Sequence, residues 1–423
     1  MKSNLVKRLA IVLVCIAFLL TTTIQRIKLA QASASASAPA PLLAQGRPVD
    51  WWFVFKLNAS KFPDCGGATR TCPFGGTVGN YKDGLQYVFA SSESQTLKQG
   101  QGCAGSTSTD PIGATFAQVY NGSYNYLIWN DQFYNDPPIQ GCSGNSCSAP
   151  WGHSKGMLVW DNTGNGFVMQ VTTPSWPAAG SKRHPRANDG NTLGCIGDDN
   201  VLVSQHFFAL KLNKQDVVNV LRGLQNASVV TDPKNGQIVS NGGPSEVQTL
   251  VTSLGTRSKS NDVIQSTLSS GVKMISKPSN LNVPPWQMVS ATLGGPSLRT
   301  ATWWATPKIP TTTNTTEIKC WDKALSKPGA VQIATSGNWN GAEIGLIGGD
   351  GPNFNHAKIG VSISGDRHYA IFGDMNQQGS LSGPNCKSSQ NGRGGLFYVM
   401  ENESLSSSIK SLLDGGTVPT KLP

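Results

Sequence analysis

A short unit that occurs twice, about 200 residues apart, constrains the fold of this chain more than any other feature. Each copy begins with His-x-Lys, continues as an apolar segment, turns at a glycine-containing sequence and returns as a second apolar segment; the copies start at His153 and His356. Side chains two residues apart in a strand point to the same face of a sheet, so each imidazole would project beside its lysine. Two such units predict two similar lobes, which must face each other if the units form one site.

The histidines and lysines of the two units are the candidate catalytic residues. The chain contains only 5 histidines, and two of them stand two residues before a lysine. An imidazole can attack phosphorus or transfer a proton near neutral or acid pH, and a lysine supplies fixed positive charge for a phosphate. A surface pair on a strand would explain either unit alone, but the matching contexts of both favour a phosphoryl-transfer site. Its members would be His153, Lys155, His356 and Lys358.

The first unit also contains a competing motif. Residues 152–156 are Gly-His-Ser-Lys-Gly, which satisfies the Gly-x-Ser-x-Gly pattern of serine hydrolases with Ser154 as the nucleophile. That nucleophile follows a buried strand and begins a helix. Here a loop rich in Cys, Ser and Pro precedes the serine, a strand-like segment follows it, and Ala357 takes its place in the second unit. A serine hydrolase is therefore the less favoured alternative.

The composition indicates a globular chain rich in loops, with 14% charged residues, 47 glycines and 25 prolines in 423 residues. The start is typical of a secretory signal, because basic residues precede an apolar stretch at residues 10–20 and Ala-Ser repeats follow it. We expect a signal peptide over residues 1–36, with a retained N-terminal anchor as the alternative, and no other membrane span. Removal of the five basic residues before Ser33 lowers the net charge from +10 to +5, which suits an anionic partner such as nucleic acid.

Cysteine usage predicts disulfides. Cys15 lies in the apolar stretch of the signal, and an even number of cysteines remains in the exported chain, with their pairing left open. These are Cys65, Cys72, Cys103, Cys142, Cys147, Cys195, Cys320 and Cys386. Cys142 and Cys147 could hold a metal with other ligands, but the spacings typical of zinc sites are missing. A disulfide that closes a loop is favoured there, and no metal site is expected.

Hydrophobic patterns predict a mixture of strands and helices. Strands are expected at residues 49–57, 85–89, 124–129, 157–160, 166–172, 287–293, 301–304, 330–334, 359–363 and 368–372. Helices are expected at residues 213–224, with Asn213 as the N-cap, and at residues 246–254 and 262–275; residues 202–212 are a strand or a short helix. Residues 225–245 are polar and rich in Gly and Asn, which makes them the expected boundary between the lobes.

With these motifs the sequence resembles the deoxyribonuclease II family, acid endonucleases related to the phospholipase D superfamily. The resemblance runs through most of the mature chain, at residues 46–57, 84–87, 126–132, 152–156, 173–177, 355–358 and 373–376. The two His-x-Lys units and the Gly-Asp-Met-Asn of residues 373–376 carry the most information. Their order and spacing together are specific, although each short piece is weak on its own.

The resemblance implies an α/β fold, with mixed sheets covered by helices, in which two phospholipase D-like lobes form a pseudo-dimer within one chain. The lobes would be residues 45–235 and 236–415. It also implies an endonuclease that cuts double-stranded DNA in acid, needs no divalent metal or other cofactor, and leaves 3′-phosphate and 5′-hydroxyl ends. A catalytically inactive relative that only binds nucleic acid is the alternative.

In the implied mechanism one histidine attacks phosphorus to form a phosphohistidine, and the other protonates the departing 5′-oxygen. We assign His153 as the nucleophile and His356 as the acid. Lys155 and Lys358 would neutralise the phosphoryl oxygens. Asn376 would donate a hydrogen bond to a phosphate, unless it is only a turn residue.

A basic loop and two departures from the family pattern complete the site expectations. Lys182, Arg183 and Arg186 would bind DNA, although a solvated loop also explains them. The aspartate that the wider superfamily has five residues after each motif lysine is absent at both motifs, as in the deoxyribonuclease II branch. The family histidine that precedes Pro174 by three residues is Val171 here, so its accessory role is missing or belongs to another residue such as His184.

Double-stranded DNA, bound through its phosphate backbone, is the expected partner. The oligomeric state is left open, with a dimer as one alternative. Export predicts a secreted or periplasmic protein, or a lysosomal one if the source is an animal-like eukaryote, with no membrane attachment after signal cleavage.

Overall fold

The computed structural model describes residues 38–65, 73–75, 84–105, 107–142, 146–196 and 200–421. The chain divides into two compact units, Met1–Ala38 and Pro39–Pro423, and every element described below belongs to the second unit. The expected signal peptide lies outside the described residues. Within those residues, none of the helices combines the length and the apolar character needed to cross a membrane.

The first large sheet contains the first motif and is antiparallel throughout. Its eight strands follow the order β10-β6-β7-β8-β9-β3-β4-β5. The strands are β3 Trp51–Lys56, β4 Tyr87–Ser91, β5 Ser94–Gln99, β6 Asn125–Asn130, β7 Lys155–Trp160, β8 Gly166–Val171, β9 Gln205–Leu212 and β10 Val239–Ser240. Strand β3 is buried along its whole length, as its aromatic and β-branched residues predict.

The second large sheet contains the second motif. Its seven strands follow the order β11-β12-β19-β18-β17-β13-β14, and only the β13–β14 pair is parallel. The strands are β11 Ile264–Thr267, β12 Lys273–Lys277, β13 Leu298–Ala301, β14 Val331–Ile333, β17 Ile359–Ser362, β18 Tyr369–Gly373 and β19 Gly395–Glu401. Two small hairpins complete the strands: β1 Leu42–Ala44 with β2 Arg47–Pro48, and β15 Ser336–Trp339 with β16 Ala342–Gly345.

The two large sheets repeat one strand order around their motifs. The first motif strand is followed across the sheet by β8, β9 and β3, and the second by β18, β19 and β12. Each of β9 and β19 then leads into a helix with an asparagine N-cap: Asn213 caps α3 Lys214–Asn226, and Asn402 caps α6 Glu403–Leu412. The repeat expected from the short motifs therefore extends over strand, turn, strand, strand and helix.

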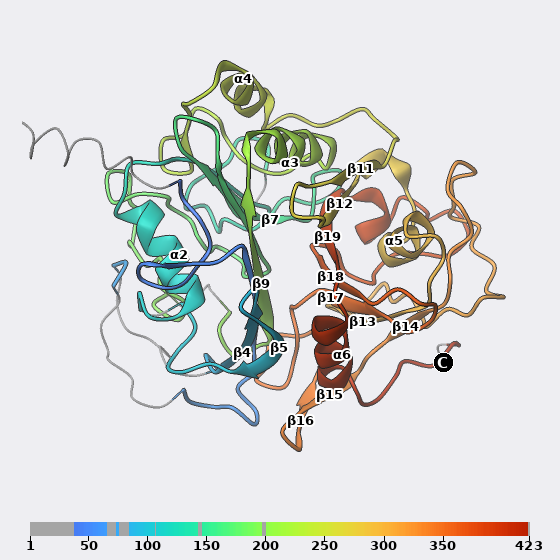
Figure 1. The fold of residues 1–423 in the computed structure, drawn as a ribbon. Helices are drawn as coiled ribbons and strands as arrows, with labels where there is room; N and C mark the ends of the chain where they lie inside the picture. Colours follow the sequence, from blue (N-terminus) through green and yellow to red (C-terminus); the bar gives the residue numbers. More distant parts are fainter. Residues whose placement is uncertain are drawn as a thin grey trace, which may run out of the picture. The chain divides into compact units, whose positions relative to one another are not determined.

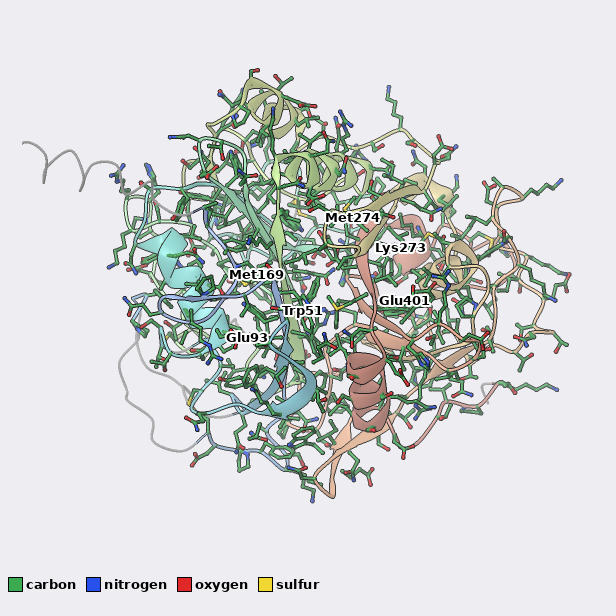
Figure 2. All side chains as sticks on the ribbon, in the orientation of Figure 1. Trp51, Glu93, Met169, Lys273, Met274 and Glu401 are labelled. Atoms are coloured by element: carbon green, nitrogen blue, oxygen red, sulfur yellow. A yellow bond between two sulfur atoms is a disulfide. The ribbon has the colours of Figure 1, made fainter. Side chains whose placement is uncertain are left out.

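Aromatic side chains pack the two sheets against each other. Phe372 of β18 stacks on Phe53 of β3 and on Phe208 of β9, with ring centroids 4.6 and 4.4 Å apart. Helix α3 contacts strands of both sheets, and α6 contacts β5 of the first sheet as well as β17 and β18 of the second (Figure 1). The buried methionines Met169 of β8 and Met274 of β12 show how both sheets contribute to the same core (Figure 2).

The remaining helices cover the outer faces. Helix α2, Pro111–Tyr120, has Asp110 as its N-cap and packs against β1 and β3. Helix α4, Ser245–Ser253, packs against α3, and α5, Pro285–Thr292, packs against β14. Two short 3₁₀ helices, Ser279–Leu281 and Ser389–Gly392, complete the described elements.

The predicted α/β class is confirmed, and so are the helix capped by Asn213 and the hairpin after each motif. Three predictions are wrong. The strand expected at residues 301–304 is absent beyond Ala301, where β13 ends, because Trp303 packs against His356 and Trp304 donates to the carbonyl oxygen of Ile309. Residues 262–275 form the β11–β12 hairpin instead of a helix, because β12 pairs with β19 from the far end of the chain. Residues 287–293 belong to α5 instead of a strand, because Pro285 occupies its first turn and fixes a helical φ. Strand β10 joins the first sheet although it lies beyond residue 235, and the lobe boundary stays a prediction.

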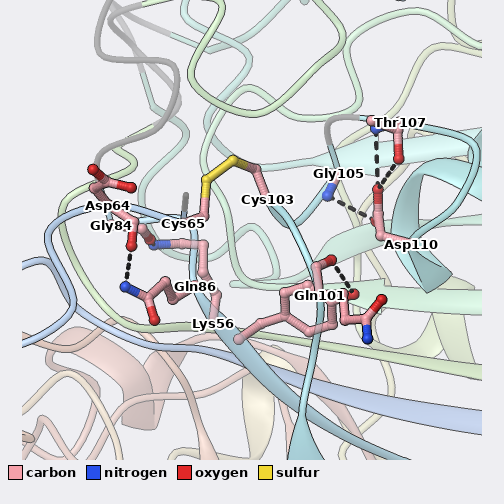
Figure 3. Close-up of a disulfide and its surroundings, with 11 residues drawn as sticks. Lys56, Asp64, Cys65, Gly84, Gln86, Gln101, Cys103, Gly105, Thr107 and Asp110 are labelled. Carbon is pink, nitrogen blue, oxygen red and sulfur yellow. Dashed lines mark hydrogen bonds between the residues drawn. A yellow bond between two sulfur atoms is a disulfide. The ribbon is translucent and has the colours of Figure 1, made fainter. Parts of the chain in front are cut away.

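Disulfides are present, as the cysteine count predicts. Within the described residues Cys65 pairs with Cys103, Cys142 with Cys147, and Cys320 with Cys386. Cys195 is also disulfide-bonded. Figure 3 shows the Cys65–Cys103 bond close to Lys56 at the end of β3 and to Gly84. The Cys142–Cys147 bond favours the loop-closing role over a metal site at this pair.

Candidate active site

His153 lies in the loop that leads directly into β7, where backbone and ring are both fixed by the second sheet. Its backbone N–H donates to the carbonyl oxygen of Gly394 at 2.8 Å. Its Nδ1 lies 2.7 Å from the carbonyl oxygen of Asp374. A carbonyl can only accept, so Nδ1 carries the proton and Nε2 of the neutral ring keeps a free lone pair. This tautomer is the one that a histidine nucleophile requires.

His356 occupies the equivalent place before β17. Its backbone N–H donates at 2.8 Å to the carbonyl oxygen of Ser204, which directly precedes β9 of the first sheet. The ring packs edge-to-face against Trp303, with centroids 4.3 Å apart. Its Nε2 lies 3.3 Å from Nδ2 of Asn200 and 3.6 Å from a carboxylate oxygen of Asp350. Asp350 is largely exposed, so solvent screens its carboxylate, and the buried ring takes up a proton only in acid.

Burial and charge couple the two motifs electrostatically. Burial lowers the pKa of His153 well below 6.5; the carboxylate of Asp131 opposes this, while the charges of Lys155, Arg393 and Lys358 lower the pKa further. Burial likewise lowers the pKa of His356 well below 6.5, and the same two lysines add to the effect. Each histidine therefore experiences the lysine of the other motif. The structure brings the four motif residues into one electrostatic environment although about 200 residues separate them in sequence.

Lys155 belongs to a buried network of three charged groups. Its Nζ donates to one carboxylate oxygen of Asp131 at 2.6 Å, and Arg393 donates to the other at 2.8 Å. Burial raises the pKa of Asp131, but the nearby cations, Lys155 first, outweigh burial and hold that pKa well below its usual range. Arg393 also donates to the carbonyl oxygens of Cys147, Trp151 and Gly152, so this arginine near the start of β19 supports the backbone just before the first motif.

Lys358 is held differently from Lys155. Its Nζ donates to the carbonyl oxygen of His356. Burial lowers the pKa of Lys358 to about 7, with a further contribution from the charge of Lys155. Its backbone N–H donates to Nδ1 of His206 at 3.1 Å, and Nε2 of that ring lies 3.3 Å from Oε1 of Gln170. His206 is thereby a neutral, structural histidine that links β9 to the second motif.

Asp374 connects the two sheets beneath His153. Its carboxylate accepts from Nε2 of Gln170 at 3.0 Å and from the backbone N–H of Leu396 at 2.9 Å, while its carbonyl oxygen receives the ring proton of His153. Burial raises the pKa of Asp374 to about 7. The residue thus fixes the orientation of the ring from its place directly after β18.

The substrate-binding candidates lie in different surroundings. Asn376 is buried, with Nδ2 donating to Gln378 at 2.8 Å and Oδ1 lacking a partner among the described residues. Lys182 and Arg183 are exposed. Arg186 is buried, where it pairs with Asp136 and donates to main-chain oxygens. Arg186 therefore stabilises its own loop in this structure, whereas Lys182 and Arg183 face solvent.

The exposed basic loop that contains Lys182 and Arg183 adjoins β6 at a point away from the first motif. Arg183 and His184 line a surface pocket with Tyr126. Tyr126 is four residues along β6 from Asn130, which pairs with Lys155. At the rise of an extended strand this corresponds to a separation of about 13 Å.

The serine-elbow alternative does not match the structure. Ser154 is followed by strand β7 and not by a helix, and its hydroxyl accepts from Nε1 of Trp129 at 2.8 Å. Among the described residues, no group of three or more His, Cys, Asp or Glu side chains has an arrangement suited to a metal ion.

Three functional candidates lie outside the two His-x-Lys motifs: Asp131, Asp374 and Arg393. The two aspartates lie within residues 126–132 and 373–376, which already stand out in the sequence for their resemblance to the family. Nothing local in the sequence distinguishes Arg393, because its partner Asp131 is 262 residues away.

Comparison with known proteins gives one family and a consistent group of relatives. The family model described as Deoxyribonuclease II matches residues 41–415. Deoxyribonuclease-2-alpha of Sus scrofa is 32% identical over 158 residues, which cover 36% of this chain and 37% of that protein. Deoxyribonuclease-2-alpha of Mus musculus is 28% identical over 217 residues, which cover 46% of this chain and 54% of that protein. Deoxyribonuclease-2-beta of Mus musculus is 30% identical over 159 residues, which cover 36% of this chain and 38% of that protein. The matches thus span about a third to a half of these curated relatives.

Proposed function

The chain belongs to the deoxyribonuclease II family, and we propose that it is an endonuclease that hydrolyses DNA phosphodiester bonds through a phosphohistidine. One observation carries this proposal. The backbone N–H of each motif histidine is bound by the residue that directly precedes a strand of the opposite sheet, and the lysine of each motif lowers the pKa of the other histidine. Two imidazoles and two ammonium groups in one environment are suited to phosphoryl transfer.

In the first step Nε2 of His153 attacks the phosphorus of the scissile diester. The N–P bond forms as the bond from phosphorus to the 5′-oxygen breaks, and protonated His356 gives its proton to that oxygen. The hydrogen bond from Nδ1 of His153 to the carbonyl oxygen of Asp374 supports this role, because it leaves Nε2 free and orients the ring. The products of this step are a 5′-hydroxyl end and a phosphohistidine that carries the 3′ end.

In the second step water attacks the phosphohistidine. His356, now neutral, accepts a proton from the water as the N–P bond breaks, which leaves a 3′-phosphate and restores His153. Lys155 and Lys358 would bind the non-bridging oxygens in both steps and offset the charge that develops there. The protein's own cations would thus take the part that a divalent metal plays in other nucleases, and no cofactor is required.

Acid activity follows from the burial of the donor. The pKa of His356 is lowered well below 6.5, chiefly by burial, so the protonated fraction that the first step needs grows as the pH falls toward that lowered value. The pKa of His153 is lowered in the same way, which keeps the nucleophile neutral in moderately acid solution. Both effects favour cleavage below neutral pH.

Double-stranded DNA is the proposed partner, and the chain is proposed to be exported. Lys182 and Arg183 are exposed, and Arg183 shares a surface pocket with Tyr126, which lies about 13 Å along β6 from the residue that pairs with Lys155. They are suited to bind phosphates away from the scissile one. The disulfides support an oxidising compartment, such as the periplasm, the cell exterior or a lysosome. The two lobes, residues 45–235 and 236–415, would form the pseudo-dimer within one chain.

A plasmid-nicking assay at acid pH in EDTA tests the function. We expect the wild-type chain to cut and to leave ends that polymerase can extend only after removal of a 3′-phosphate. His153→Ala and His356→Ala should each lose cleavage and keep DNA binding, and Ser154→Ala should retain activity. Cleavage that requires added Mg²⁺ would contradict the mechanism, and wild-type binding without cleavage would leave an inactive DNA-binding relative as the function.

A further inference from the structure

Two lysines outside the motifs occupy equivalent buried positions in the two lobes. Lys56 is the last residue of β3, next to β9, and Lys277 is the last residue of β12, next to β19. Their exposed fractions are 1% and 0%. In the repeated strand order β3 corresponds to β12 and β9 to β19, so the two lysines are counterparts.

Each ammonium group is surrounded by main-chain carbonyl oxygens. Nζ of Lys56 donates to the carbonyl oxygens of Gly84 at 2.8 Å, of Val201 at 2.6 Å and of Val203. Figure 3 shows Lys56 and Gly84 in this part of the molecule. Three acceptors match the three donors of an ammonium group, so the surroundings are built for hydrogen bonding and not only for packing a long chain.

Nζ of Lys277 has a matching environment. It donates to the carbonyl oxygens of Asn391 and Arg393, both at 2.8 Å, and of Pro278 at 3.3 Å. Burial lowers the pKa of each of the two lysines to about 7. An amine buried this deeply depends on its hydrogen bonds, because burying a polar group without them costs free energy.

The carbonyl groups bound by the lysines belong to the loops that receive the motif histidines. Val203 is followed by Ser204, whose carbonyl oxygen accepts the backbone N–H of His356 at 2.8 Å. In the other lobe Arg393 is followed by Gly394, whose carbonyl oxygen accepts the backbone N–H of His153 at 2.8 Å. Each lysine therefore fixes the residue just before the one that holds the histidine of the opposite lobe.

Side chains of the same loops also reach the site. Asn200, directly before Val201, lies 3.3 Å from Nε2 of His356. Arg393 donates to Asp131, the partner of Lys155. Fixing the backbone of each loop thus fixes groups that contact the motif of the other lobe.

We propose that Lys56 and Lys277 are positioning residues of the two-histidine site, and that they act crosswise: Lys277 of the second lobe orients His153, and Lys56 of the first lobe orients His356. The inference rests on the proposed function for its catalytic consequence only. The crosswise dependence itself is a property of the fold and can be measured without any substrate.

Selective replacement of each lysine tests the crosswise dependence. Lys56→Met and Lys277→Met keep a long apolar side chain and remove the three donors. The chain has 5 histidines, so ¹⁵N-histidine labelling gives resolvable ring signals that report tautomer and environment. We expect Lys277→Met to shift the ring signals of His153 and to speed exchange of its backbone amide at least tenfold, with His356 unchanged. Lys56→Met should do the reverse.

The kinetics of the two variants and a control replacement complete the test. Each replacement should lower kcat by roughly 10² with little change in KM, because a displacement of about 1 Å in a reacting group has such an effect. The exposed Lys211→Met should alter neither histidine. If a methionine variant does not fold, two measurements replace it. One uses the corresponding glutamine variant, which keeps hydrogen-bond donors without the charge. The other is amide exchange of the wild-type chain.

The outcomes are distinct. Equal perturbation of both histidines by either variant, or of neither, would overturn the crosswise assignment. Rapid exchange of both histidine amides in the wild-type chain would overturn it as well. Absence of nuclease activity in the wild-type chain would contradict the proposed function, yet the NMR result would still confirm or refute the positioning role.

Discussion

The buried carboxylate of Asp131 offers a demanding test of the charge network at the first motif. Its side chain is 1% exposed, and it separates two cations, with Nζ of Lys155 at 2.6 Å and Nη2 of Arg393 at 2.8 Å. Asp131→Asn keeps the shape and removes the charge, so both cations stay buried without their anion. Removing one partner of a buried ion pair costs about 3–5 kcal/mol, and we expect the free energy of unfolding to fall by that amount.

Equilibrium denaturant unfolding at about pH 6, where the carboxylate is ionised, measures this change. The pKa of Asp131 is depressed in the folded state, so its stabilisation is present above the ordinary Asp pKa and is lost as the pH falls through the folded value. The difference between wild type and variant should therefore shrink in strong acid.

A matched control separates burial from charge. Asp50 pairs with Lys211 at 3.5 Å on the surface, with both side chains more than half exposed, and Asp50→Asn should cost about 0–1 kcal/mol. The double variant Asp131→Asn with Arg393→Met should lose less than the sum of the single losses, by about 0.5–3 kcal/mol. A loss below 1 kcal/mol for Asp131→Asn alone would refute the view that the network holds the motif together.

Three further predictions concern pH, packing and covalent links. Cleavage rate should rise as the pH falls below neutral, since burial lowers the pKa of both motif histidines, and a rate that instead rose above pH 7 would contradict the protonated donor. Gly394→Ala should cost about 1–3 kcal/mol and abolish cleavage, because its Cβ would lie 2.1 Å from a backbone oxygen; thermal unfolding and the nicking assay measure both effects. Loss of the Cys320–Cys386 bond, which spans 66 residues, should destabilise the chain by about 4 kcal/mol. Loss of the Cys142–Cys147 bond, which spans 5 residues, should cost about 2 kcal/mol. Equal losses in denaturant unfolding would argue against loop length as the cause.

Local sequence signals predicted the parts of the fold that depend on local chemistry. Asn213 before a run of apolar residues at helical spacing identified α3 correctly, and the turn residues after each motif identified both hairpins. The error at residues 287–293 was avoidable, because Pro285 at the start and Gly294 after the end are the usual signals of a helix. The apolar content of the segment suggested a strand, and the boundary residues decided otherwise.

Other parts could not be predicted because they depend on distant partners. The β11–β12 hairpin has an ambiguous pattern, and its pairing with β19, about 120 residues further along the chain, decides its structure. The motif histidines and lysines were visible as a repeated pattern. Their supporting groups, Asp374 and Arg393, act through contacts with residues more than 200 positions away. Asp374 lies in the Gly-Asp-Met-Asn segment that the resemblance picks out, but its partner is not visible there, and Arg393 has no local signal at all.

A trapped intermediate tests the two-histidine mechanism most directly. Thymidine 3′-(p-nitrophenyl phosphate) has a leaving group that needs no acid, so His356→Ala should complete the first step and stall before hydrolysis. We predict a burst of one equivalent of nitrophenol, with wild-type turnover as the positive control, and a phosphoryl adduct that mass spectrometry locates on His153. His153→Ala should give neither burst nor adduct. A burst in His153→Ala, or an adduct on any other residue such as Ser154, would contradict the assignment of His153 as the nucleophile.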